Sequence, residues 1–128
     1  MRTRYPTRRR GHLTYDQAKE LLGNRDKKKL CNNTWLERAG WSGAQPVYGI
    51  RLHSTVVVRL WADDTYSLYM EGWDSVTTRA RIRVFSPASV FGSPPRVARI
   101  LNDPDTAVPF FDGIRVDADG LPITGGEQ

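Results

Sequence analysis

VYGIRLHSTVVVRLWADDTYSLYM, residues 47–70, is the stretch that decides the fold of this 128-residue chain. It holds three runs rich in β-branched and aromatic residues, 47–52, 55–61 and 65–70, separated by His53-Ser54 and Asp63-Asp64. Such runs favour strands, and short polar breaks between them are typical of hairpins. The stretch therefore predicts an antiparallel meander.

Alternation along these runs predicts which face of the sheet is buried. Successive side chains of a strand point to opposite faces, so one face packs and the other meets solvent. In the second run, Val56, Val58 and Leu60 alternate with Val57, Arg59 and Trp61. In the third run, Tyr66, Leu68 and Met70 alternate with Ser67 and Tyr69. We expect a core of Leu22, Leu36, Ile50, Leu52, Val56, Val58, Leu60, Leu68, Ile82, Phe85 and Phe110.

The flanking sequence predicts further short elements. Thr14 opens a T-Y-D-Q capping box, which predicts a helix over 15–22 that Gly23 ends. Residues 24–29 are expected to form a polar linker. More strands are expected at 33–38, 97–101, 108–111 and 114–116, with a loop at 92–95 and a turn at 102–105.

Residues 77–85 fit two patterns. Arg79, Arg81 and Arg83 alternate with apolar residues as in a strand, whereas Thr78, Ile82 and Phe85 share one face of a helix that Thr77 could cap. We expect a short helix here. The predicted fold class is α+β: a small twisted antiparallel sheet with two short helices and a basic N-terminal arm. The expected parts are a flexible basic arm (1–12), a single domain (13–116) and a flexible acidic tail (117–128).

Charge is divided unevenly along the chain and suggests binding of nucleic acid. The net charge of +5 is +7 over residues 1–38, +3 over 39–100 and −5 over 101–128. A basic surface attracts phosphates, and nearby aromatic rings stack on bases. The candidate binding residues are Arg8, Arg9, Arg10, Lys27, Lys28, Lys29, Trp73, Arg79, Arg81 and Arg83. A sheet that presents Trp35, Trp61 or Tyr69 would suit single strands or RNA; the alternative is that the tryptophans are core and the arginines a soluble rim.

The motifs of several enzyme and metal-site classes are missing. Cys31 is the only cysteine, and His12 and His53 lack metal-ligand spacing, so a zinc site is not expected. The sequence contains no phosphate-binding glycine loop and no G-x-S-x-G motif. We therefore expect no catalytic residue, no metal and no cofactor, and, because no apolar run is long enough, no membrane span.

Several motifs together resemble one family. They are LCNNTWLER (30–38), IRLHSTVV (50–57), Gly72-Trp73, TTRARI (77–82) and PFFDG (109–113). Over residues 14–116 they resemble a family of small uncharacterised bacteriophage proteins that is frequent in phages of actinobacteria. The resemblance implies a phage origin and residence in the host cytoplasm, and it brings no assigned activity.

That resemblance also supports an alternative to nucleic-acid binding. A host-takeover or anti-defence protein would bind a host protein or sequester a nucleotide signal without catalysis. Attraction between the basic residues 1–38 of one copy and the acidic residues 101–128 of another would in addition be compatible with a homo-oligomer.

Overall fold

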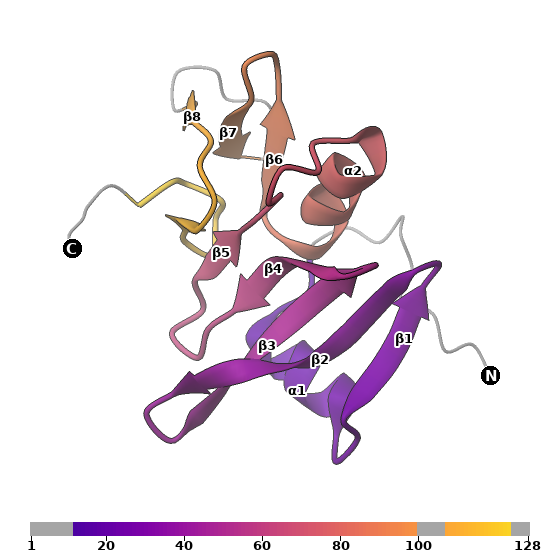
Figure 1. Cartoon of the computed structure of the whole chain (residues 1–128). Helices are drawn as coiled ribbons and strands as arrows, with labels where there is room; N and C mark the ends of the chain where they lie inside the picture. The colour runs from indigo at the N-terminus through magenta and orange to yellow at the C-terminus, as the bar shows by residue number, and fades with distance from the viewer. Residues whose placement is uncertain (1–11, 100–106, 124–128) are drawn as a thin grey trace.

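A computed structural model describes residues 12–99 and 107–123 of the chain. Within these ranges the fold is α+β, with two helices and two antiparallel sheets, neither of them closed (Figure 1). The elements in chain order are α1 (Tyr15–Leu22), β1 (Lys27–Cys31), β2 (Thr34–Ser42), β3 (Gln45–Leu52), β4 (Thr55–Leu60), β5 (Tyr66–Leu68), α2 (Val76–Phe85), β6 (Ala88–Phe91), β7 (Arg96–Arg99), β8 (Val108–Pro109) and β9 (Ile114–Val116).

The larger sheet has six strands in the order β1-β2-β3-β4-β5-β9. Its first five strands follow one another as a meander, as the alternation in residues 47–70 predicts. The sixth strand, β9, comes from the end of the domain and pairs with β5, Leu68 facing Ile114. A smaller sheet, β6-β7-β8, lies beside α2 (Figure 1).

A bulge in β4 corrects part of the expected core. Ile50 pairs with Val58 and Arg51 pairs with Val56, so Val57 is an extra residue without a partner on β3. An extra residue reverses the alternation of the strand. As a result Val57 and Val58 are both buried, and Val56 is half-buried beside Arg51 on the other face. The expected burial of Val56 is therefore wrong.

Both helices cover the same face of the larger sheet. Tyr15, Ala18 and Leu22 of α1 and Ile82 and Phe85 of α2 share one core with the inward residues of the strands. In Figure 1, α1 lies behind β2 and β3, so the face of the larger sheet turned toward the viewer is the one that α1 does not cover. Nine of the expected core residues are buried, while Phe110, like Val56, is only partly buried.

The helix boundaries follow from their caps. The Gln17 amide donates to Thr14 Oγ1 at 3.1 Å and the Thr14 amide donates to Gln17 Oε1 at 3.0 Å, which confirms the capping box. The second helix is also present, but its N-cap is Ser75 rather than Thr77: the Thr78 amide donates to Ser75 Oγ.

Two further expectations differ from the structure. The lysine-rich part of the expected linker belongs to an edge strand, because Lys27, Lys28 and Lys29 pair with β2 despite their charged side chains. Strand β6 follows α2 almost directly, where no strand is expected from the sequence. The predicted strand at 97–101 begins at Arg96 and is described as far as Arg99; the turn at 102–105 lies outside the described residues.

The two ends of the described chain are packed on the domain. His12, expected as the last residue of the arm, contacts the Tyr66 ring edge-on with centroids 5.3 Å apart. The first residues of the expected tail form a turn in which Asp117 Oδ1 accepts from the Asp119 and Leu121 amides, and Pro122 bridges to Val116. The remainder of both segments, 1–11 and 124–128, lies outside the described residues.

Candidate nucleic-acid interface

One row of paired residues crosses the uncovered face of the larger sheet from edge to edge. Residues that pair directly on neighbouring strands share a face. The row runs through all six strands as Lys27, Glu37, Gly49, Arg59, Ser67 and Arg115. A second row beside it consists of Lys29, Trp35, Arg51 and Val56.

We call these residues, together with Trp61 and Tyr69, the open face. Trp61 belongs to it because its Nε1 donates to Ser67 Oγ at 2.9 Å, and Tyr69 because the Arg59 guanidinium lies over its ring. The open face carries five basic side chains against the single carboxylate of Glu37. In the part of the chain that the structure describes, neither helix packs on this face.

Each aromatic ring of the open face has a cation above it. Lys27 Nζ and Lys29 Nζ lie 5.0 and 6.0 Å from the centre of the Trp35 ring. Arg59 Cζ lies 5.2 Å from Tyr69, and Arg115 Cζ lies 4.2 Å from Trp61. Cations at these distances are attracted by the electron-rich ring face. Four cations thus lie over three aromatic rings spread across the sheet.

Hydrogen bonds fix the arginines in place. Arg51 Nε donates to Glu37 Oε1 at 2.9 Å, and Arg115 Nε donates to Thr65 Oγ1 at 2.9 Å. Arg59 reaches across β3 at Gly49, which has no side chain, and donates from Nη1 to the Ala39 carbonyl at 2.8 Å. The guanidinium groups are therefore positioned before any ligand arrives.

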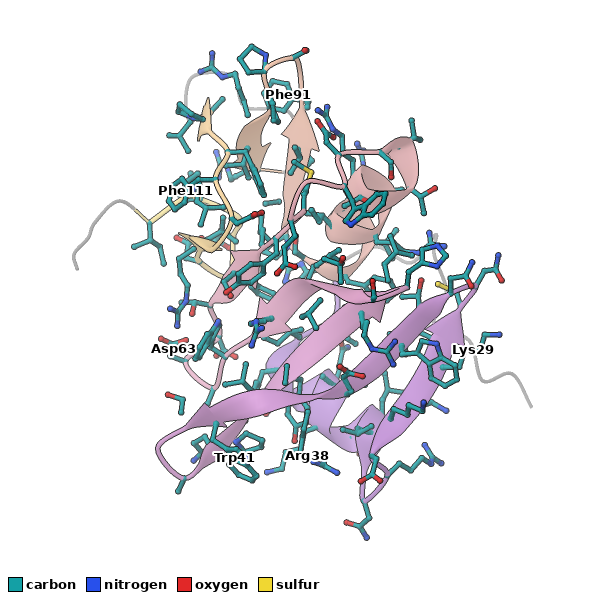
Figure 2. The ribbon with its side chains drawn as sticks, viewed as in Figure 1. Lys29, Arg38, Trp41, Asp63, Phe91 and Phe111 are labelled. Carbon is teal, nitrogen blue, oxygen red and sulfur yellow. The ribbon has the colours of Figure 1, made fainter. Side chains whose placement is uncertain are left out.

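The turn between β4 and β5 holds two carboxylates, Asp63 and Asp64, and Figure 2 shows Asp63 across the sheet from Lys29. Burial opposes ionisation of Asp63, but the hydroxyl and amide of Thr65 donate to it and Arg115 lies near. These contacts outweigh burial and hold the pKa of Asp63 below its ordinary value. Asp63 therefore stays charged at neutral pH and offsets part of the positive charge at this end of the open face.

The lysines predicted from the sequence divide between two faces. Lys27 and Lys29 lie on the open face beside Trp35, whereas Lys28 pairs with buried Leu36 and is directed to the helix side. A strand alternates its side chains, so three consecutive lysines cannot act as one cluster.

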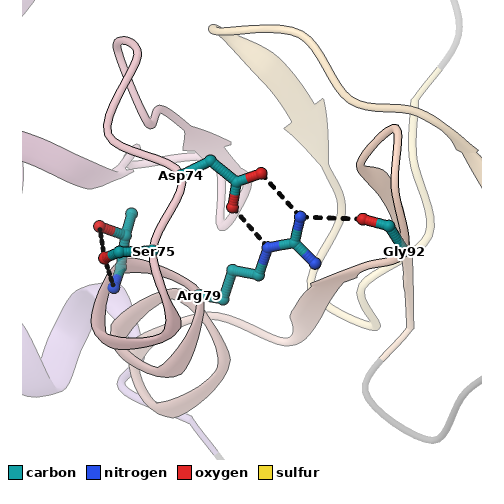
Figure 3. Close-up of polar contacts among 5 residues, drawn as sticks. Asp74, Ser75, Arg79 and Gly92 are labelled. Atoms are coloured by element: carbon teal, nitrogen blue, oxygen red, sulfur yellow. Dashed lines mark hydrogen bonds and ion pairs between the residues drawn. The ribbon is translucent and has the colours of Figure 1, made fainter.

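The predicted arginines of α2 are spread around the helix. Arg79 donates to both carboxylate oxygens of Asp74, at 2.6 and 2.7 Å, and to the Gly92 carbonyl at 2.9 Å (Figure 3). This contact lowers the pKa of Asp74 and raises that of Arg79. Arg81 donates to Thr34 Oγ1 and to the Asn32 carbonyl, which joins α2 to the β1–β2 turn.

Of the remaining predicted residues, Arg83 is exposed in the last turn of α2, and Trp73 is 68% exposed in the loop before α2. Arg8, Arg9 and Arg10 lie outside the described residues. Arg51, Arg59 and Arg115 of the open face are absent from the predicted set. The first two sit at outward positions of predicted strands, a pattern that could have identified them.

No group of residues suited to holding a metal ion occurs within 12–99 and 107–123, and no helix there is long and apolar enough to cross a membrane. Comparison with models of protein families, with curated proteins and with solved structures gives no match.

Proposed function

We propose that this protein binds single-stranded nucleic acid across the open face of its larger sheet. The observation that carries the proposal is that four cations lie over three aromatic rings on one face that neither described helix covers. A non-specific single-strand site combines positive charge, which follows the backbone, with aromatic rings on which bases stack. The open face offers both.

The guanidinium groups support the proposal as stacking surfaces as well as charges. Arg59 and Arg115 lie over Tyr69 and Trp61, and a base can stack on an arginine plane as it does on an aromatic ring. Lys27 and Lys29 are exposed at the edge of the sheet, where phosphates can reach them. The interface is therefore expected to tolerate many sequences.

The width of the sheet favours a single strand over a duplex. Six strands about 4.8 Å apart span roughly 24 Å. The major groove of DNA is about 12 Å wide and admits a helix or a two-stranded ribbon. A surface twice that width cannot reach base edges inside a duplex, whereas unpaired bases can lie against it.

On the resemblance to phage proteins we further propose that this activity belongs to the cytoplasm of an infected bacterium. The protein would act there by binding and without catalysis. Binding of a host protein is the alternative that a negative result would favour.

The experiment compares lysine variants on one strand. A labelled single strand of about 12 nucleotides, DNA or RNA, is titrated by fluorescence anisotropy between about 50 and 200 mM salt. The Lys27→Glu/Lys29→Glu variant should bind at least about tenfold more weakly, and its log–log salt slope should fall by about 1.4, since each phosphate contact on a single strand contributes about 0.7.

Lys28→Glu is the matched control for Lys27→Glu alone, because each reverses one charge on the same strand, the first on the helix side and the second on the open face. It should leave the salt slope unchanged. Equal losses in Lys28→Glu and in Lys27→Glu would show that the open face is not the interface. No binding by the unmodified protein at the lowest salt would reject nucleic-acid binding altogether.

A further inference from the structure

A cavity of about 320 Å³ lies between the β3–β4 turn and the first turn of α2. Leu52 and Val57 form an apolar part of its wall, and Trp73, from the loop before α2, also lines it. Sites for small ligands begin at about 300 Å³ and combine apolar walls with a few polar groups. The volume suits one small ligand, of about the size of a mononucleotide.

Trp73 is a free stacking surface at this cavity. Its side chain is 68% exposed, and the neighbouring Val76 is 87% exposed. An indole that contributes to a core is largely buried, so packing does not account for this position. Trp73 also has no cation over its ring among the described residues, unlike Trp35 and Trp61. One face of the indole is thus available to a planar ligand.

The polar lining of the cavity is incompletely paired. Thr55 lines the cavity with a side chain that is only 8% exposed, and its hydroxyl has no hydrogen-bond partner within the described ranges. Ser54 and Thr77 add two hydroxyls with no partner among the same residues, and His53 adds an imidazole. Among the described residues Thr55 Oγ1 is not one of the buried polar atoms without a partner, so it is accessible from the cavity and can bond a ligand atom there.

The electrostatic surroundings favour a negatively charged group. Ser75 and Thr77 at the start of α2 line the cavity, and the first turn of this ten-residue helix has no acidic residue. The positive end of a helix dipole attracts anions. The nearest carboxylate in sequence, Asp74, is paired at both oxygens with Arg79 (Figure 3). It therefore does little to repel a phosphate.

We propose that this cavity binds a nucleotide. The base stacks on Trp73, its polar edge bonds to Thr55 and His53, and the phosphate lies toward the start of α2. The base can come from a free mononucleotide or from a strand on the open face, because Arg51 of that face donates to the His53 carbonyl at 2.7 Å and so adjoins the cavity.

The test titrates the protein with each of the common ribonucleoside monophosphates by isothermal calorimetry. Trp73→Ala should weaken binding at least tenfold, in line with the contribution of one stacked base. Thr55→Val, which keeps the shape and removes the hydroxyl, should weaken it about three- to tenfold. Trp41→Ala is the matched control, because Trp41 is 66% exposed at the β2–β3 hairpin, away from the cavity. Thermal unfolding of each variant verifies folding.

The same variants are titrated with the labelled single strand. Mononucleotide binding that depends on Trp73 identifies a free nucleotide as the ligand. That result would support the cavity proposal even if the open face bound no strand. Strand binding that falls at least fivefold in Trp73→Ala, without mononucleotide binding, identifies a base of the strand. If neither ligand responds to Trp73, the proposal for the cavity is wrong, while strand binding that depends on Lys27 and Lys29 would still support the open face.

Discussion

Replacing Gly49 with alanine tests how closely the side chains of the open face are packed. Gly49 lies in β3 between Glu37 and Arg59, and a Cβ built there would be 2.7 Å from Ala39 Cβ and 3.1 Å from Val56 Cγ1. Separations below 3.0 Å between such atoms are essentially never seen. Either β2 must move, or the sheet must open at this point.

The magnitude follows from two opposing effects. Overpacking in a well-packed region typically costs about 1–3 kcal/mol. Alanine is favoured over glycine inside a strand by about 0.5–1 kcal/mol, and the backbone of Gly49 needs no left-handed conformation. We therefore expect Gly49→Ala to lower the free energy of unfolding by about 1–2 kcal/mol, which is roughly 4–8 °C in melting temperature for a domain of this size.

A double-mutant cycle with Ala39→Gly identifies the cause. That change removes the atom nearest to the new Cβ, so the double variant should recover part of the stability lost in Gly49→Ala, with Val56 Cγ1 accounting for the remainder. Urea unfolding of the four proteins of the cycle, followed by circular dichroism, measures the coupling. An unchanged midpoint in Gly49→Ala, or no coupling to Ala39, would refute the close approach of β2 and β3.

Two further predictions concern side chains that contact β5 or the residues just after it. Burial holds the pKa of His12 below 6.5, against the opposing charge of Asp119. As pH falls below about 6.5, the His12 imidazole takes up a proton more readily in the unfolded chain than in the folded one. The free energy of unfolding should therefore decrease from pH 7.5 to pH 5. Melting curves of His12→Phe, which has no titratable group at this position, should show a smaller decrease over the same pH range. Asp112 Oδ1 accepts from the Met70 and Glu71 amides at 2.7 and 3.1 Å. Asp112→Ala should lower unfolding free energy by about 1–2 kcal/mol in urea, and Asp112→Asn, which keeps the acceptor, by clearly less.

Local sequence patterns predicted the elements that depend on neighbouring residues. The helix over 15–22 was predicted correctly at both ends, because its capping box and Gly23 are contiguous with it. Strands β3, β4 and β5 were located by their β-branched and aromatic runs. The bulge at Val57 was missed, since it depends on the partner strand rather than on residues 55–61.

Long-range pairing explains what the sequence could not predict about the candidate site. Lys27 to Lys29 have no strand propensity, and only pairing with β2 makes them part of the sheet. Arg115 reaches the open face because β9 pairs with β5, which is 46 or more residues earlier in the chain. The aromatic residues Trp35, Trp61 and Tyr69 were predicted as candidates, but the cations above them come mostly from other strands.

The three lysines of the edge strand β1 also affect the tendency of the protein to aggregate at high concentration. An unpaired strand edge is a template onto which another chain can add and begin fibrous aggregation, and charged side chains along the edge oppose this. Two copies joined through β1 would bring Lys27, Lys28 and Lys29 of one chain against the same residues of the other. Mutual repulsion between these lysines therefore opposes the pairing of two copies through β1.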